Sequence, residues 1–91
     1  MAFVWDLEKA ASNLRDHGIE FEYATRVFQD PGQFEWTDDR EDYGEERLNV
    51  VGLVNASEIL VTYTLRGTDV RIISARKADR YEREEYWRSQ V

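Results

Sequence analysis

The chain has 91 residues, of which 42% are hydrophobic and 13% aromatic, and a formal net charge of −7 at pH 7. These values predict one globular domain over residues 1–91 and exclude a disordered tail. Cysteine is absent and histidine occurs once, which excludes a disulfide framework and a thiolate nucleophile and disfavours a transition-metal site. Without a long apolar run or a signal peptide pattern, we expect a soluble, cytoplasmic protein with no membrane partner.

The first predicted elements are a short strand and a helix. Residues 3–5 form an apolar run typical of a strand, and Asp6 can cap the helix that follows. Gly18 stands where a C-cap glycine is expected. One apolar stripe of this helix is expected to face the core, because its members have helical spacing: Leu7, Ala10, Ala11 and Leu14.

A second short helix is predicted from apolar residues at positions 21, 24 and 28, and the Asp-Pro-Gly run at 30–32 ends it. A short strand over 33–36 and an acidic loop over 37–46 follow. Three strands are then predicted over 47–54, 58–65 and 69–75, with turns over 55–57 and 66–68 between them. A terminal helix is predicted over 78–90.

This order, β-α-α-β-β-β-β-α, predicts an α+β fold. Short turns force neighbouring strands to be antiparallel, so the sheet is expected to be mainly antiparallel, with two N-terminal helices packed on it and a C-terminal helix. The chain has no glycine-rich phosphate loop and no topological switch point. A nucleotide-binding α/β enzyme of the usual type is therefore excluded.

The charge is distributed unevenly along the chain. Residues 1–46 hold 13 acidic and 4 basic side chains, a net of −9, whereas residues 47–91 hold 6 acidic and 8 basic side chains, a net of +2. Ten of the twelve basic residues are arginine, which grips phosphate with two parallel hydrogen bonds. The total charge argues against nucleic-acid binding, whereas the arginines of the second half favour contacts to phosphate.

Arginines are concentrated at the predicted sheet and at the start of the last helix. Arg66 ends one strand and Arg71 lies on the next, so the two are expected to be near neighbours in a meander. Arg71 and Arg76 have opposite parity along their strand, so they share a face only if a bulge intervenes or the strand ends earlier. Clustered guanidinium groups can bind a phosphate and stabilise developing charge, although strand-end arginines commonly just pair with surface carboxylates.

Other side chains are candidates for proton transfer. His17 can act as a base, but a histidine in the last turn of a helix also has an ordinary role at the helix dipole. Lys9 is a possible acid or phosphate contact, with solvation as the commoner role. Glu45 or Glu46 can serve as a base beside Arg47, and both also suit a solvated loop.

Several motifs occur together along the chain. They are Phe3-x-Trp5-Asp6-x-x-Lys9, Asn13-Leu14-Arg15-x-His17-Gly18, Phe21-x-x-Ala24-x-x-Val27-Phe28-x-Asp30-Pro31, Glu45-Glu46-Arg47-x-x-x-x-Gly52, Arg66-Gly67-x-x-x-Arg71-Ile72-Ile73-Ser74-Ala75-Arg76 and Tyr81-Glu82. The combination of these motifs in this order is specific, and it resembles the BrnT toxins of bacterial type II toxin–antitoxin modules. The similarity extends from Phe3 to about Tyr86.

The resemblance implies a RelE-like fold and a metal-independent, cofactor-free endoribonuclease that cleaves RNA through its 2′-hydroxyl and inhibits translation. It also implies that a BrnA-type antitoxin neutralises the toxin, in a possible heterotetramer of the two chains. Operator DNA would then be contacted only through the antitoxin. The catalytic candidates carried over are Lys9, Glu46, Arg66 and Arg76. The RNA-phosphate contacts carried over are Arg47, Arg71 and Arg80.

A second interpretation fits the acidic character of the chain. An inactive family member could serve as an antitoxin-binding co-repressor module, and an orphan interaction domain is a third reading. Growth arrest on expression, abolished by replacing Arg66 or Arg76, distinguishes the enzyme from both alternatives.

Overall fold

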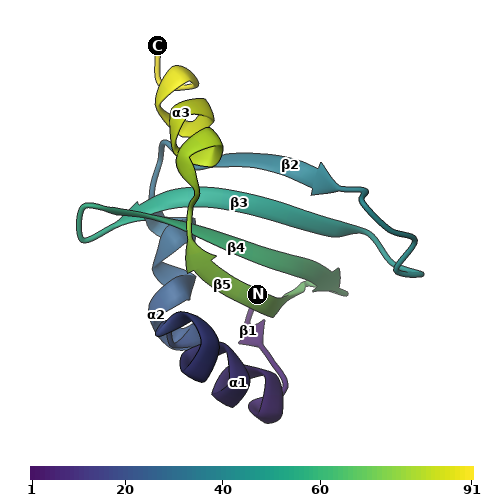
Figure 1. Ribbon diagram of the computed structural model, residues 1–91. Helices are drawn as coiled ribbons and strands as arrows, with labels where there is room; N and C mark the ends of the chain where they lie inside the picture. The colour runs from purple at the N-terminus through teal and green to yellow at the C-terminus, as the bar shows by residue number, and fades with distance from the viewer.

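The computed structural model describes residues 1–91 as an α+β fold built on one five-stranded sheet (Figure 1). The element order confirms the predicted β-α-α-β-β-β-β-α arrangement. No helix is long and apolar enough to cross a membrane. The elements are β1 (Phe3–Val4), α1 (Leu7–His17), α2 (Phe21–Ala24), the 3-10 helix η1 (Thr25–Gln29), β2 (Phe34–Asp38), β3 (Arg47–Val54), β4 (Ser57–Arg66), β5 (Asp69–Lys77) and α3 (Arg80–Arg88).

The strands lie in the order β1-β5-β4-β3-β2. Strands β2 to β5 form the predicted antiparallel meander, and β1 adds to β5 in parallel. The β3–β4 turn consists of Asn55 and Ala56, both with positive φ, so Ser57 belongs to β4 and not to the turn. Positive φ at both turn residues matches the right-handed twist of a two-residue hairpin. Strand β2 runs on to Asp38, inside the segment predicted as a loop.

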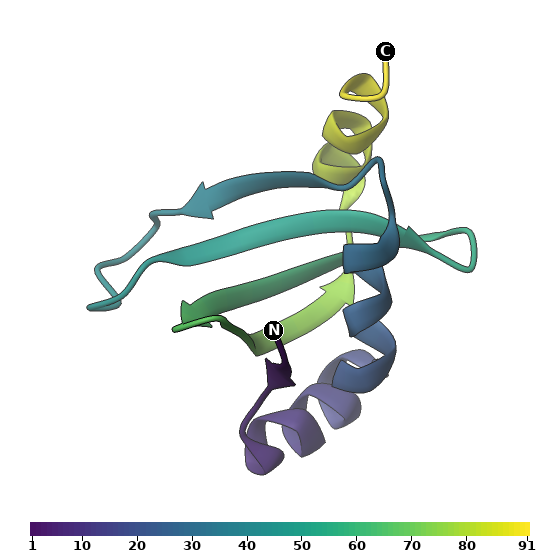
Figure 2. The ribbon, with the colours of Figure 1, turned by 180° about the vertical axis from the view of Figure 1, so that it is seen from behind.

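The two faces of the sheet are covered differently. Helices α2 and η1 cross one face, which is the near side in Figure 2, and bury the main core there. Helix α3 covers only one end of the other face, where Tyr86 packs with Val51 and Leu60. The main core comprises Ile19, Phe21, Ala24, Val27, Val50, Val54, Ile59, Val61, Tyr63, Val70, Ile72 and Ala75.

Helix α1 has the predicted caps. The Asp6 side chain accepts hydrogen bonds from the backbone N–H groups of Glu8 and Lys9, and Gly18 takes the left-handed conformation at φ 70°. The predicted burial of the apolar stripe holds only for Ala10, which packs half-buried against the main core. It is wrong for Ala11, which is exposed, and for Leu7 and Leu14, which are 80% and 44% exposed. The one buried residue of this helix is Asn13.

Asn13 is buried because it completes the hydrogen bonding of β5. Its side-chain amide donates to the carbonyls of Ile19 and Ala75 at 2.9 Å each, and its Oδ1 accepts from the Ala75 N–H at 3.0 Å. Strand β1 pairs with β5 only at Val70 and Arg71, which leaves the edge of β5 without a strand neighbour at Ala75. Buried backbone groups without partners are costly, so this requirement rotates α1 and turns its leucines outward.

Helix α3 starts two residues later than predicted. Asp79 caps it and forms a capping box with Glu82, which stops the helix from beginning at Ala78. Ala78 instead continues along the sheet, where its N–H donates to the carbonyl of Glu58 and its side chain is buried. The helix therefore begins next to Arg76, at the end of β5.

Asp30 joins α3 to the sheet. Its Oδ2 accepts hydrogen bonds from the Tyr86 hydroxyl at 2.6 Å and the Leu53 N–H at 2.8 Å, and its Oδ1 accepts from the Gly32 N–H at 2.8 Å. Burial acts to raise the pKa of Asp30, but these hydrogen bonds outweigh it and lower the pKa below 3.8. Burial and the same hydrogen bond raise the pKa of Tyr86 to about 12.

We expect the free energy of unfolding of Asp30→Asn to fall less steeply at acidic pH than that of the wild type. Because the folded-state pKa of Asp30 is depressed, its contribution is present above pH 3.8 and is lost as the pH falls through the folded value. Urea unfolding between pH 2.5 and 7 measures this contribution as the difference between wild type and variant. Asp38, whose pKa is also lowered, is present in both proteins and cancels. Parallel pH curves for the two proteins would contradict the prediction.

Candidate functional site

A β-bulge in β5 places Arg71 and Arg76 on the same face of the sheet. Ser74 pairs with Thr62, but Ile72 pairs with Tyr63, so Ile73 is an extra residue. This extra residue reverses the alternation, and both arginines then project to the side away from α2 and η1. From the sequence, the two arginines were expected to share a face only if such a bulge intervened or the strand ended earlier.

We call this side the open face, and its floor is polar. Asn49 and Thr62 are opposite each other on β3 and β4, and the Thr62 hydroxyl donates to Asn49 Oδ1 at 2.7 Å. Ser74 continues the same row on β5. Arg76 pairs with Leu60 on β4, and Arg71 pairs with Thr64. Because these two β4 residues are four positions apart, about 13 Å of strand separates the two arginine positions. The side chains of arginine are long enough to converge over this floor.

Arg76 is held at the α3 end of the open face by Glu82. Its Nη1 and Nη2 donate to the two carboxylate oxygens at 2.8 Å each, and Nη1 also donates to the Lys77 carbonyl at 3.2 Å. The hydrogen bond to Glu82 raises the pKa of Arg76, against a lowering effect of burial. Glu82 in turn accepts from the Asp79 N–H at 2.8 Å. The Nε edge of the Arg76 guanidinium has no partner and can bind an anion with two N–H groups.

A third arginine, Arg40, reaches the open face from the β2–β3 loop. Arg40 donates from Nε and Nη2 to the two carboxylate oxygens of Asp38, at 2.8 and 2.9 Å, although its own side chain is 72% exposed. The hydrogen bond to Arg40 holds the pKa of Asp38 below its usual value. Arg40 is close enough to Arg76 for its charge to oppose the rise in the pKa of that group.

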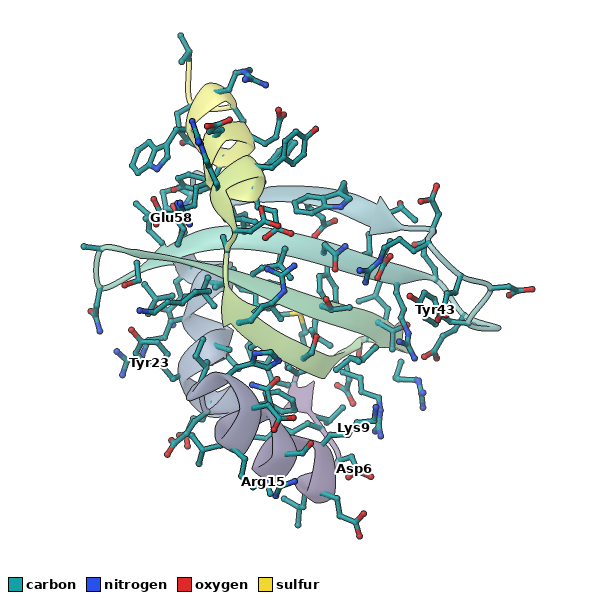
Figure 3. The ribbon with its side chains drawn as sticks, in the orientation of Figure 1. Asp6, Lys9, Arg15, Tyr23, Tyr43 and Glu58 are labelled. Atoms are coloured by element: carbon teal, nitrogen blue, oxygen red, sulfur yellow. The ribbon has the colours of Figure 1, made fainter.

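Arg47 and Arg66 lie at the other end of the open face, around Glu45. The guanidinium carbon of Arg47 lies 3.9 Å from the ring centre of Tyr43, which is labelled beside the β2–β3 loop in Figure 3. Its Nε is buried without a hydrogen-bond acceptor and is 3.9 Å from Glu45 Oε2. Arg66 Nη2 donates to Glu45 Oε1 at 3.2 Å. Glu45 thus lies between two guanidinium groups.

The predicted cluster of basic residues therefore spans the whole face. Arg66 pairs with Asp69 and Arg71 with Thr64, so these two arginines are the diagonal neighbours that the meander predicted. Arg66 and Arg76 are at the two ends of the open face. Arg76 pairs with Leu60, which is six residues from Arg66 along β4, so about 20 Å of strand separates the two arginines. Arg71, between them, is closer to Arg76 than Arg66 is.

The other candidates lie outside this group. Lys9 is exposed on α1, below the sheet in Figure 3, and lines a shallow hollow with Arg15 and Ser12. The Glu46 side chain is on the opposite face, where its charge adds to the effects of burial and of Glu35 that raise the pKa of Tyr63. Arg80 is exposed on α3 and paired with Glu84. His17 is exposed in the last turn of α1, consistent with an ordinary helix-end role.

Sequence reasoning missed Arg40 and the floor residues Asn49, Thr62 and Ser74. The floor residues were predictable in principle. The two-residue turn sets the register of β3 and β4, and a polar pair opposite each other in otherwise apolar strands is unusual. Arg40 had no such signal, because its place depends on how the loop folds back to Asp38. The structure brings together no group of three or more His, Asp or Glu side chains that could hold a metal ion.

The comparison with known families agrees with this arrangement. The family model described as the ribonuclease toxin BrnT of type II toxin–antitoxin systems matches residues 5–82, which include all of the strands and helices except β1 and most of α3. No curated protein matches the chain. A matched stretch of this extent, on a fold whose open face gathers arginines, identifies the chain. It belongs to the BrnT family of ribonuclease toxins, which act in type II toxin–antitoxin systems with a cognate antitoxin as partner and RNA as substrate.

Proposed function

We propose that the chain cleaves RNA on its open face by attack of a ribose 2′-hydroxyl on the adjacent phosphate. A bond forms between the 2′-oxygen and phosphorus, and the bond from phosphorus to the 5′-oxygen breaks. The 2′-hydroxyl proton passes to a base, and the leaving 5′-oxygen gains a proton. The products are a 2′,3′-cyclic phosphate and a 5′-hydroxyl. The reaction needs positive charge at the nonbridging oxygens and acid–base help.

The observation that carries this proposal is that Arg76, held by Glu82 through its two Nη atoms and without a partner at Nε, shares one face of the sheet with Arg71 and with the polar floor. Donors fixed before the substrate arrives stabilise developing charge without having to reorganise. Arg76 meets this condition because Glu82 holds it in place. Arg66, at the far end, is better suited to bind a neighbouring phosphate along the strand.

Glu45 is the carboxylate best suited to accept the 2′-hydroxyl proton. It is about 30% exposed and lies between Arg66 and Arg47. Asp38 is almost fully buried, and Glu82 is engaged by both Nη atoms of Arg76. Lys9 is exposed on α1, away from the open face, and Glu46 forms no ion pair with an arginine, so we assign these two residues no proton transfer.

Cleavage of RNA by this route would inhibit translation in the cytoplasm, with a BrnA-type antitoxin as the neutralising partner. The antitoxin would provide the contacts to operator DNA, since the N-terminal half of the toxin is strongly acidic. We propose a complex with two copies of each chain.

The end groups of the products test the chemistry. We expect a messenger transcript incubated with the protein, with and without ribosomes, to carry 2′,3′-cyclic phosphate and 5′-hydroxyl ends. EDTA is expected to leave the rate unchanged in the ribosome-free reaction. After the cut sites are mapped, a single 2′-deoxynucleotide before the scissile phosphate is expected to abolish cleavage there.

Two results would contradict the proposal. Cleavage of the 2′-deoxy substrate, or 5′-phosphate ends, would refute attack by the 2′-hydroxyl. A folded protein that binds the antitoxin but cuts no RNA in either arm would favour the co-repressor module instead.

A further inference from the structure

Helix α1 presents an apolar stripe to solvent. Leu7, Ala11 and Leu14 are spaced at i, i+4 and i+7 and lie on one side of the helix. All three are exposed, Leu7 by 80% and Leu14 by 44%. The rotation that Asn13 imposes accounts for their exposure but gives the leucines no partner within the chain. Exposed apolar stripes with a polar surround mark interaction surfaces.

Two hollows flank Leu14. One has a volume of about 410 Å³ and is lined by Leu14, Gly18, Ile19, Glu20, Tyr23, Ser57, Ile59 and Lys77. The other has a volume of about 240 Å³ and is lined by Trp5, Ala10, Ala11, Leu14, Glu20, Phe21 and Glu22. Leu14 is thus a ridge between two partly apolar depressions. This shape can receive apolar side chains spaced along a helix.

The two hollows beside Leu14 are mainly acidic, whereas Lys9 and Arg15 line a third hollow on the Ala11 side of the helix. Glu20 lines both hollows, Glu22 lines the smaller one, and Glu8 follows Leu7 on α1. All three glutamates are exposed and none forms an ion pair. Lys77 is the single cationic residue in the two linings. Charge complementarity therefore favours an occupant that carries basic residues beside its apolar ones.

We propose that the α1 surface, defined as Leu7, Ala11, Leu14 and the two hollows, is where the cognate antitoxin docks. The occupant is an amphipathic helix of the antitoxin whose apolar stripe is flanked by lysine or arginine. Membership of the family establishes that the chain has an antitoxin partner. The exposed leucines and the acidic hollows indicate which kind of antitoxin helix can bind there.

The α1 surface is separate from the catalytic proposal. Helix α1 lies beyond the β5 edge of the sheet in Figures 1 and 2, whereas the arginines project from the open face. Asn13 connects the two, since it binds the backbone of Ala75, the residue before Arg76. The interaction can therefore be removed by substitutions that touch no residue of the open face.

The test measures affinity for the antitoxin encoded beside this chain, using titration calorimetry on the purified free toxin. Leu7→Glu and Leu14→Glu are each expected to weaken binding at least tenfold. Glu20→Lys is expected to weaken it as well, with a loss that shrinks as salt rises. Leu65→Glu is the matched control, because Leu65 is 56% exposed at the end of β4, outside the α1 surface. Thermal unfolding confirms that each variant is folded.

Wild-type affinity in both leucine variants would overturn the proposal, as would an equal loss in Leu65→Glu. A toxin homodimer that Leu14→Glu dissolves without changing antitoxin affinity would instead assign the stripe to a second copy of the chain. RNA cleavage by the free variants is expected to stay at the wild-type rate. Failure of the catalytic proposal would appear as absent cleavage with antitoxin binding intact, so the two failures are distinguishable.

Discussion

Arg76→Ala is expected to lower the rate of RNA cleavage by about 10²–10³-fold, which corresponds to roughly 3–4 kcal/mol of transition-state stabilisation. Glu82 occupies the edge of the guanidinium formed by Nη1 and Nη2. The adjacent edge, with Nε–H and the second N–H of Nη2, has no partner and can donate to two nonbridging phosphate oxygens. A fork of two donors fits the phosphate better than a point charge does.

Arg76→Lys separates geometry from charge. The ammonium group keeps the positive charge and can still pair with Glu82, but it lacks the second edge. We therefore expect Arg76→Lys to recover only a small part of the lost activity. If charge alone mattered, the lysine variant would cleave at close to the wild-type rate, and the forked contact would be refuted.

Single-turnover cleavage of a mapped transcript measures these rates. Arg88→Ala is the matched control, because Arg88 pairs with a glutamate on the same helix and lies away from the open face. It is expected to cleave at the wild-type rate. Circular dichroism and thermal unfolding check the folding of Arg76→Ala. We expect this variant to fold, because the hydrogen bond from the Asp79 N–H to Glu82 does not involve the arginine. A wild-type cleavage rate in Arg76→Ala would remove this residue from the site.

Glu82→Gln is expected to lower kcat by on the order of 10²-fold, with a smaller change in KM. Glu82 touches no substrate in the proposed reaction, so it is a positioning residue that acts through Arg76. The glutamine amide can still accept from the Asp79 N–H, but its NH₂ group faces an Nη atom that also donates. Arg76 then loses its fixed orientation, and a displacement of about 1 Å can cost 10²-fold in rate.

A double-mutant cycle distinguishes positioning from a structural effect. In the Arg76→Ala background, Glu82→Gln is expected to change kcat no further, because there is no guanidinium left to orient. A purely structural effect, through the helix cap, would lower kcat equally in both backgrounds. Glu85→Gln removes the charge of another α3 glutamate that is paired with an arginine and is expected to leave kcat unchanged. A full effect of Glu82→Gln in the absence of Arg76 would contradict the positioning role.

Much of the fold could be predicted because it depends on neighbours in the chain. Asp6 and Gly18 cap α1 where the sequence placed them, and the short turns produce the predicted meander. The motifs of the chain also indicated the family that residues 5–82 match. These features follow from capping, turn chemistry and hydrophobic periodicity, each of which acts over a few residues.

The candidate site was only partly predictable. The sequence singled out Arg47, Arg66, Arg71 and Arg76, and all four project from the open face. It also proposed Glu46, which strand alternation turns to the other face beside Tyr63, while Glu45 takes the place between two arginines. The sequence placed the start of β3 correctly at Arg47 but left both glutamates in a loop, so only the tertiary structure decided which of them lies between two arginines.

The sequence by itself determined the element order, the helix caps, the meander and the family. Only the tertiary structure decided which way α1 faces and which side of the sheet Arg71 occupies. Asn13 and Ala75 are 62 residues apart, and their hydrogen bonds outweigh the local preference of α1 to bury its leucines. The bulge at Ile73 likewise depends on how β5 matches β4. Asn13 satisfies backbone groups that are buried only once the sheet has formed, and the bulge is defined only by the register of two paired strands, so short-range patterns contain neither.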